Sequence, residues 1–354
     1  MTPGFVYRSS PRRVVFGAGT LAELPTEAER LGIERALVVS TPGQVSLAEA
    51  AASQLGERCA AILPKARMHT PVEVTDDAMA VVAANRIDGL VAIGGGSTTG
   101  LAKALAYRTD LPQLIVPTTY AGSELTDILG ETVDGAKTTV RDPRILPETV
   151  LYDVGLTLGL PPAVSVTSGM NAIAHAVEGL YAPDGNPVVA MMAEEGIRAL
   201  AVAIPGIAAD PRDGGARRDA LYGAWLCGLV LADTSMGLHH KLCHVLGGSF
   251  GLPHAETHTV VLPHVAAFNA PYAGEAMSRA ARALGSNDAP GALFDLAHDA
   301  GAPTSLREIG MPEDGLDRAA EAATASPYAN PRPIERHAIR RLLEEAWRGE
   351  RPTA

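Results

Sequence analysis

Short apolar runs alternate with helical patterns throughout the first half of this 354-residue chain. The run Gly89–Ile93 is apolar at almost every position and ends in glycines, which is typical of a parallel strand buried on both faces. Alternation of this kind predicts βαβ units and a doubly wound parallel sheet. Strands are expected at 13–17, 35–40, 89–93 and 113–117, and helices at about 20–31, 44–55, 76–85 and 98–108.

The second half differs, because from Thr167 onward the pattern is long, Ala-rich and helical with few strand candidates. Leu160-Pro161-Pro162 is the natural boundary between the two patterns. We therefore expect an α/β domain over residues 1–160 and an all-helical domain over residues 161–354. A cleft between the two domains is the default place for a ligand.

The charge balance and the cysteine count limit the class of protein. Forty acidic residues against 29 Lys and Arg give a net charge of −11, which argues against binding to nucleic acid or to an anionic membrane. No apolar run approaches the roughly 18–20 residues that cross a bilayer, and the N-terminus lacks the pattern of a signal peptide. Three scattered cysteines fit a reducing compartment, so a cytoplasmic protein is expected.

A glycine-rich segment, Gly94–Gly100, follows the buried strand and begins a helix. Glycines let the backbone approach an anion closely, and the first N–H groups of a helix attract negative charge. The segment departs from the G-x-G-x-x-G fingerprint of ordinary dinucleotide-binding folds. It predicts a phosphate site, and the alternative is a tight turn without a ligand.

A second polar loop, Pro117–Glu124, follows the next buried strand. Ligands of open α/β sheets bind at the carboxyl ends of strands, so its hydroxyl groups could contact a phosphate or a nicotinamide. An ordinary polar turn is an equally good interpretation of this loop alone.

Histidine is concentrated in the helical half, where six of the ten lie between His239 and His264. Residues four apart share one face of a helix. Such pairs, in otherwise apolar sequence, favour a site over isolated core histidines, and converging imidazoles suit a divalent metal or proton transfer. The pairs are Asn171 with His175, His240 with His244, and His254 with His258.

Taken together, these motifs resemble the iron-containing alcohol dehydrogenase superfamily over nearly the whole chain. Within it, the segments 13–19, 68–74, 117–124, 221–227 and 330–333 are similar to the maleylacetate reductases. The resemblance implies the dehydroquinate synthase-like fold, in which an α/β NAD(P)-binding domain precedes an all-α domain that carries a catalytic metal. It also implies a homodimer, and reduction of maleylacetate to 3-oxoadipate during the breakdown of aromatic compounds.

The resemblance assigns cofactor contacts to the α/β domain. It places Gly95, Gly96 and Ser97 at the pyrophosphate, Thr118 and Thr119 at the nicotinamide side, and Thr70 and Lys137 near the cofactor. The residue that reads the adenosine ribose is expected just after the second strand. An acidic residue there would repel the 2′-phosphate of NADPH. Because Thr41 stands there, use of both NADH and NADPH is expected.

In the superfamily the metal is held by an Asp and three His. The matching positions here are Asn171, His175, His240 and His254. A neutral amide oxygen binds a divalent cation far more weakly than a carboxylate does. Three histidines alone can still hold zinc, but we expect a site that works without metal.

The implied reaction adds hydride to the alkene of a dicarboxylate substrate, and negative charge develops on the ketone oxygen. Donors must therefore face that oxygen, and a proton must reach the neighbouring carbon. We expect His244 and His254 to be donors, His175 and His240 to shape the pocket, and Tyr120 to be a candidate proton donor. Lys241 and Arg332 are candidates for the substrate carboxylates, although either could equally be a solvated surface cation. Asn171 is also expected to contact the substrate, because it lacks the negative charge by which an aspartate would repel a dianion.

Three other functions remain open from the sequence. A metal-dependent dehydrogenase of small alcohols or aldehydes would contain tightly bound iron or zinc. A carbon–oxygen lyase of the dehydroquinate synthase type would need several cations for a phosphorylated substrate, but only four lysines are present. A nucleotide-binding module without turnover would need the phosphate loop but not the clustered histidines.

Overall fold

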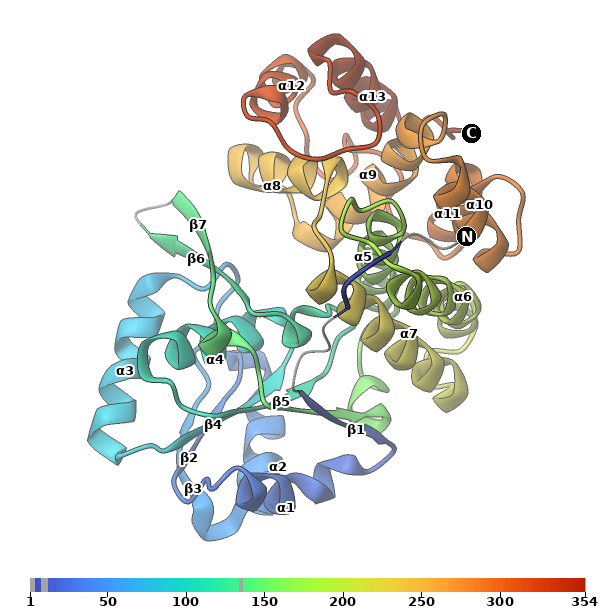
Figure 1. The fold of residues 1–354 in the computed structure, drawn as a ribbon. Helices are drawn as coiled ribbons and strands as arrows, with labels where there is room; N and C mark the ends of the chain where they lie inside the picture. The colour runs from blue at the N-terminus through green and yellow to red at the C-terminus, as the bar shows by residue number, and fades with distance from the viewer. Residues whose placement is uncertain (1–3, 8–11, 134–135, 354) are drawn as a thin grey trace. The chain divides into compact units, whose positions relative to one another are not determined.

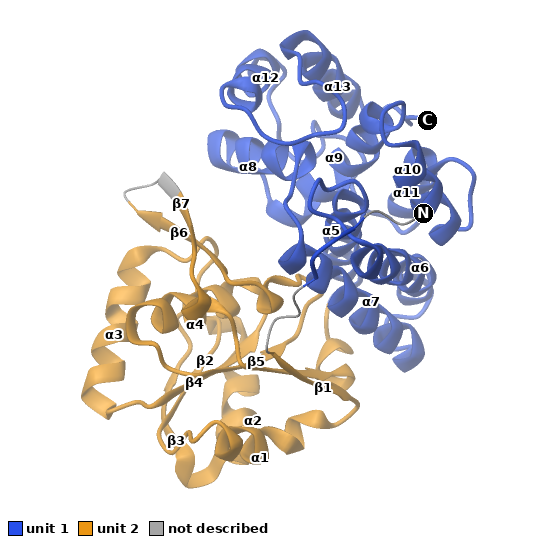
Figure 2. Ribbon diagram, in the orientation of Figure 1, with its two compact units in different colours: residues 1–9, 161–354 blue, residues 10–160 orange. Residues whose placement is uncertain are grey.

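The computed structural model describes residues 4–7, 12–133 and 136–353. The chain divides into two compact units (Figure 2). The sheet unit comprises residues 10–160, and the helical unit comprises residues 1–9 with 161–354.

The sheet unit is built on six parallel strands in the order β1-β8-β5-β4-β2-β3. The four predicted strands are present, and two more complete the sheet. Cys59–Leu63 was not predicted because it is a partly exposed edge strand rich in small residues, and Thr149–Asp153 because polar ends leave it a very short apolar run. The bounds are β1 Arg13–Gly17, β2 Ala36–Val39, β3 Cys59–Leu63, β4 Gly89–Gly94, β5 Gln113–Pro117 and β8 Thr149–Asp153.

Helices cover both faces of this sheet (Figure 1). One face packs against α1 (Leu24–Arg30) and α2 (Val45–Leu55), and the other against α3 (Val72–Asn85) and α4 (Gly96–Thr109). Successive side chains of a strand point to opposite faces. Accordingly, Val38 of β2 packs with the first pair of helices and its neighbours Leu37 and Val39 pack with the second. The predicted doubly wound α/β architecture is thus confirmed.

A two-stranded antiparallel hairpin, β6 (Ile128–Val133) with β7 (Ala136–Arg141), extends from the sheet unit and was not predicted. Short 3-10 turns join the other elements. They are η1 Thr20–Glu23, η2 Pro42–Gln44, η3 Gly56–Arg58, η4 Ser123–Leu125, η5 Pro143–Ile145 and η6 Val154–Thr157.

The helical unit consists of α-helices with one 3-10 turn among its described residues, which confirms the predicted all-helical second half. Its central helix is α5, which is buried continuously from Ser165 to Gly179. Two long helices begin with side-chain caps: Asn186 accepts from the first turn of α6, and Asp213 from that of α7. The bounds are α5 Pro162–Leu180, α6 Pro187–Ala209, α7 Gly214–Asp233, α8 Leu238–Phe250, α9 His254–Asn269, α10 Gly274–Ala283, α11 Ala289–Asp299, η7 Glu313–Gly315, α12 Leu316–Thr324 and α13 Arg336–Arg348.

Among the described residues, no single helix has both the length and the apolar composition needed to span a membrane. Helices α7 and α8 reach that threshold only as a pair, and the two are bent by 96° where they meet.

Candidate active site

The glycine-rich segment joins β4 to α4 in a conformation that a side chain would disturb. Gly94 has φ of 153°, and a Cβ there would lie 2.4 Å from Thr98 Oγ1 and 2.7 Å from Gln44 Oε1. Helix α4 then begins at Gly96 without a side-chain cap. Because the first N–H groups of a helix lack partners within it, this start can receive an anion.

The two loops singled out in the sequence lie against each other. The Thr118 N–H donates to the Gly94 carbonyl at 3.0 Å. A Cβ on Gly95 would lie 3.0 Å from Thr119 Cγ2, so the backbone of one loop packs directly on the side chain of the other. The structure therefore brings Gly95, Gly96 and Ser97 together with Thr118 and Thr119 at one edge of the sheet.

A chain of hydrogen bonds extends this edge to the end of β2. Thr41 Oγ1 donates to Gln44 Oε1 at 3.1 Å, and Gln44 Nε2 donates to Thr118 Oγ1 at 3.0 Å. The strand order reverses between β2 and β4, because β3 lies outside β2 while β5 lies on the other side of β4. Crevices at such reversals are where open α/β sheets bind ligands. Gln44 is a residue that the sequence analysis missed.

Thr70 joins the same edge from the loop before α3. A Cβ on Gly100 of α4 would lie 2.4 Å from Thr70 Oγ1, so this close contact requires glycine. His69 and Thr70 both have positive φ, at 64° and 45°, an uncommon conformation for non-glycine residues. Lys137 belongs to β7, but its side chain is outside the described part of the structure.

Lys103 of α4 holds the loop that begins at Pro117 and the residues just after it in place through hydrogen bonds. It is 1% exposed, and its Nζ donates to the Ser123 carbonyl, to Thr126 Oγ1 at 2.8 Å and to the Ile128 carbonyl at 3.1 Å. Burial lowers the pKa of Lys103 to about 7, although the nearby Glu124 carboxylate opposes the shift. Tyr120 is fully buried in the same loop, so it lies beneath the surface of the sheet unit.

In the helical unit, histidines from three helices form one cluster. The rings of His175 on α5 and His240 on α8 have centroids 5.1 Å apart. His258 on α9 lies 5.0 Å from His240 and 4.3 Å from His254. His239 completes the cluster at 4.8 Å from His258. The structure therefore brings together His175, His240 and His254 as predicted, and it adds His239 and His258.

Burial keeps much of this cluster neutral. It lowers the pKa of His175, His240 and His258 well below the ordinary value and that of His239 to about 4. The neighbouring imidazoles add to the shift, because two like charges so close together repel. These rings are therefore neutral imidazoles near pH 7.

His244 and His254, the two expected donors, are both exposed side chains. His244 lies one turn after His240 on α8, and His254 is the first residue of α9. Exposed imidazoles can exchange protons with solvent, unlike the buried rings.

Glu178 lies beneath the cluster and is 1% exposed. It is one turn beyond His175 on α5, and its Oε2 lies 2.6 Å from His240 Nδ1. Sequence analysis missed this residue, although its spacing of three from His175 puts both on one face of the helix. His258 was noted only as the partner of His254, and the same i,i+4 rule could have placed it in the site.

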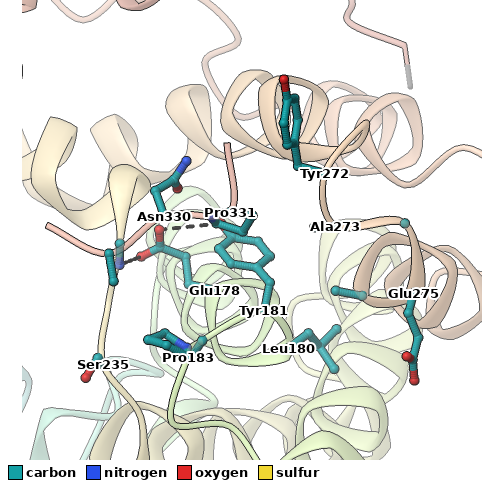
Figure 3. Close-up of a pocket in the computed structure, with 15 residues that line it drawn as sticks. Glu178, Leu180, Tyr181, Pro183, Ser235, Tyr272, Ala273, Glu275, Asn330 and Pro331 are labelled. Carbon is teal, nitrogen blue, oxygen red and sulfur yellow. Dashed lines mark hydrogen bonds between the residues drawn. The ribbon is translucent and has the colours of Figure 1, made fainter. Parts of the chain in front are cut away.

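A pocket of about 450 Å³ opens on the side of Glu178 and Tyr181 (Figure 3). Its lining comes from the end of α5 and from segments near 235, 273 and 330, and it includes none of the clustered histidines. The Tyr181 hydroxyl donates to Glu178 Oε1 at 3.4 Å. Glu178, one of the residues that line this pocket, also contacts His240 of the cluster.

The two predicted substrate cations have different surroundings. The Arg332 guanidinium lies 4.1 Å from the Phe268 ring centroid, and its Nη1 donates to the Phe268 carbonyl at 3.1 Å. The hydrogen bond to the Phe268 carbonyl uses one of the five N–H donors of the guanidinium. Lys241 is a half-buried residue of α8 between His240 and His244. Contact of either side chain with a substrate stays a prediction.

Comparison with known proteins identifies a family in which both units occur in one chain. The profile of the iron-containing alcohol dehydrogenase family matches residues 11–154, and that of the C-terminal part of the Fe-containing alcohol dehydrogenase family matches residues 165–347. This chain belongs to the iron-containing alcohol dehydrogenase family. The resemblance seen in the sequence is thereby confirmed.

Two members of the family are similar to the chain along almost its whole length. The maleylacetate reductase of Burkholderia cepacia is 56% identical over 349 residues, which cover 99% of both chains. The crystal structure of maleylacetate reductase from Agrobacterium tumefaciens superposes with a TM-score of 0.96, at 56% identity, and covers 99% of this chain and 100% of that one. The sulfoacetaldehyde reductase of Bifidobacterium kashiwanohense, solved in complex with NAD+, shares the fold at a TM-score of 0.89 and 22% identity, with 97% of this chain and 99% of that chain covered.

The family name raises the question of iron, and the donor atoms can be tested for it. Asn171 Oδ1, His175 Nδ1 and His240 Nε2 are buried, and no group in the described part of the protein hydrogen-bonds to them. A buried polar atom without a partner costs about 1–3 kcal/mol, so such a group is expected to meet a ligand. Imidazole and amide donors fit a divalent transition metal. The residues therefore fit a cation, but through neutral ligands only.

Proposed function

We propose that this member of the iron-containing alcohol dehydrogenase family reduces the alkene of maleylacetate with NADH or NADPH and yields 3-oxoadipate. The observation that carries the proposal is the 56% identity to a maleylacetate reductase over 99% of both chains. At that similarity a small-alcohol dehydrogenase is the less favoured alternative. Aromatic-compound breakdown, a cytoplasmic homodimer and domains divided at residue 160 are parts of the same proposal.

The sheet edge supports the cofactor assignment. The uncapped start of α4 can receive the pyrophosphate against Gly95, Gly96 and Ser97. Thr118 and Thr119 lie beside it, where they would meet the nicotinamide end. Thr70 and Lys137 are proposed as further cofactor contacts on the resemblance.

Thr41 bears on the choice between the two cofactors. Its hydroxyl is hydrogen-bonded to Gln44, and no carboxylate stands at this position to repel a 2′-phosphate. We expect kcat/KM for NADH and NADPH to agree within about 100-fold, or about 2.7 kcal/mol. Thr41→Asp should lower kcat/KM for NADPH alone, whereas Thr41→Ser should leave the ratio unchanged. A wild-type preference beyond that limit would contradict the assignment.

The reduction needs a hydride, a proton and stabilisation of an oxyanion. When bound, the nicotinamide would supply the hydride for the new C–H bond at the alkene carbon β to the ketone, and negative charge would develop on the ketone oxygen as an enolate. His244 and His254 are proposed to donate hydrogen bonds to that enolate oxygen. Because both are exposed, either can pass a proton to the α carbon and regain one from solvent.

The buried residues would shape the space around the substrate. His175 and His240 are neutral near pH 7, so they add no repulsive or attractive charge of their own. Asn171 removes a negative charge that would repel a dianionic substrate. Lys241 and Arg332 are proposed to meet the two carboxylates, and Tyr120 is retained as a proton-donor candidate on sequence grounds.

A metal is proposed to be dispensable for this chemistry. If one binds, Asn171, His175, His240 and His254 would hold it, and it would act as a Lewis acid toward the ketone oxygen. Their neutral donor set favours weak binding. The histidine donors provide the alternative means of stabilising the oxyanion.

The test is oxidation of NADH by maleylacetate, with protein stripped by a strong chelator and assayed with and without zinc or ferrous iron. Rapid oxidation by the stripped protein is the expected result. Activity only after metal addition would show that the ion is required. Absence of activity in every arm would reject the proposed substrate, and small alcohols and aldehydes would then be tested with the same preparations.

A further inference from the structure

We propose that Glu178 is a positioning residue that fixes the orientation and tautomer of His240, and that its charge supports the histidine cluster. The activity arm of this proposal rests on the proposed function, and the spectroscopic arm does not. The starting observation is the contact of 2.6 Å between Glu178 Oε2 and His240 Nδ1.

Glu178 also holds the start of α8, the helix that carries His240. Its Oε1 accepts from His239 N at 2.8 Å, and its Oε2 accepts from Gly237 N at 3.1 Å and from His240 N at 3.3 Å. The helix has no cap from its own side chains. A carboxylate from α5 therefore takes the place of the N-cap residue, and both the charge and the N–H groups favour it there.

Glycine at position 237 makes this close approach possible. A Cβ at Gly237 would lie 3.0 Å from the Ala329 carbonyl oxygen and 3.2 Å from Glu178 Oε1. Both contacts are tighter than a Cβ normally makes. The sequence Gly237-Leu238-His239-His240 therefore lets a buried carboxylate reach the first turn of α8.

The contact determines which nitrogen of His240 carries the proton. A carboxylate only accepts hydrogen bonds, so Nδ1 must be the N–H donor in this pair. In the neutral ring Nε2 then has the lone pair. Nε2 is buried and has no hydrogen-bond partner in the described part of the protein, so it is the atom left for a substrate proton or a cation.

The charge of Glu178 adds a second effect. Asn171 is neutral, and Glu178 delivers a negative charge to the cluster through the His240 ring. A carboxylate behind an imidazole stabilises a positive charge that forms on the far nitrogen. The N–H groups of Gly237, His239 and His240 all donate to the Glu178 oxygens, which favours the ionised carboxylate.

The first experiment measures the tautomer in the wild-type protein without substrate. Histidine labelled with nitrogen-15 reports by NMR whether Nδ1 or Nε2 carries the proton, and the His240→Gln variant assigns the signal. We expect the Nδ1–H form of His240. Observation of the Nε2–H form would overturn the proposal, whatever substrate the protein reduces.

The second experiment compares Glu178→Gln, Glu178→Asp and Glu194→Gln as steady-state reductases. Loss of the charge in Glu178→Gln should lower kcat about 10–100-fold, as removal of such supporting carboxylates does, and leave KM within threefold. Glu178→Asp keeps the charge and should recover at least half of that loss on a logarithmic scale. Glu194, which pairs with Arg279 and Arg282 elsewhere in the helical unit, is the matched control and should behave as wild type.

A folded Glu178→Gln protein with kcat within threefold of wild type would overturn the proposal. So would a Glu178→Asp protein that recovers none of the loss. If Glu178→Gln fails to fold, the tautomer of His240 in the wild type and the kcat of Glu178→Asp still test the proposal. If no protein reduces maleylacetate, the proposed function fails, and the tautomer measurement alone tests the role of Glu178.

Discussion

The sheet edge and the histidine cluster are built on different principles. At the sheet edge, backbone and small side chains form the site: Gly94, Gly95 and Gly100 permit close approach, and threonines surround them. In the cluster, imidazoles from three helices meet around a buried carboxylate. The first site depends on the path of the chain, and the second on the identity of side chains far apart in sequence.

This difference predicts different responses to mutation. A change at the sheet edge should damage both folding and ligand binding, because the same backbone serves both. A change at an exposed histidine should remove chemistry and leave the fold intact.

The largest effect is expected at the two exposed histidines, His244 and His254. His244→Ala and His254→Ala should each lower kcat about 10²–10⁴-fold, as is typical when a proton-transfer group is lost. Because both side chains are exposed, the midpoint of thermal unfolding should change by less than about 2 °C. Steady-state kinetics and calorimetry measure the two quantities.

His298→Ala is the matched control, since that histidine is exposed on α11, where it contacts Asp299 and stacks on Phe294, and lies outside the histidine cluster. It should retain wild-type turnover. If His244→Ala and His254→Ala both kept near-wild-type turnover as well, their assignment as donors would be wrong.

An intermediate effect is expected at Gly94. Its φ of 153° and a Cβ contact of 2.4 Å with Thr98 Oγ1 make alanine strained there. Gly94→Ala should lower the free energy of unfolding by about 1–3 kcal/mol, the usual range for such strain. Weaker NADH binding, by at least about tenfold, should accompany it if the loop holds the pyrophosphate.

Chemical denaturation and NADH fluorescence titration provide the measurements for Gly94→Ala. Gly159→Ala is the control in the same unit, because its Cβ would meet no atom within 4 Å. A Gly94→Ala protein that is less stable but binds NADH as the wild type does would show that this backbone serves folding alone. That result would contradict the proposed contrast between the sheet edge and the histidine cluster.

The smallest effect is a pH dependence of stability at Lys103. Its pKa of about 7 in the folded protein lies below the ordinary 10.5, so the unfolded chain binds more protons between these values. Stability should therefore rise with pH from about 7 upward and be lost as pH falls toward 7. As pH rises, the unfolding free energy of the wild type should increase relative to that of Lys103→Met by up to about 1.4 kcal/mol per pH unit.

Denaturant titrations at pH 7.5, 8.25 and 9 would measure this slope as an order-of-magnitude test. Lys65→Met is the control, since Lys65 is an exposed lysine of the same unit. Parallel stability curves for wild type and Lys103→Met would show that Lys103 is protonated at all these pH values.

Local features of the fold could be predicted from the sequence. Four strands of the sheet, the start of α4 and the i,i+4 histidine pairs follow from runs of a few residues, because strand and helix periodicity is a local property. The partly exposed strand β3, the short strand β8 and the β6–β7 hairpin were missed. Their patterns are brief, and long-range pairing rather than local apolar content determines them.

The sequence by itself determined which residue types the two sites contain and which family the chain resembles. Only the tertiary structure decided that Gln44 links Thr41 to Thr118, that His258 is central among the imidazoles, and that Glu178 supports His240. The reason is distance along the chain, since Glu178 and His240 are 62 residues apart. Periodicity relates neighbours on one element, whereas packing of α5 against the start of α8 brings this carboxylate and imidazole within hydrogen-bond reach.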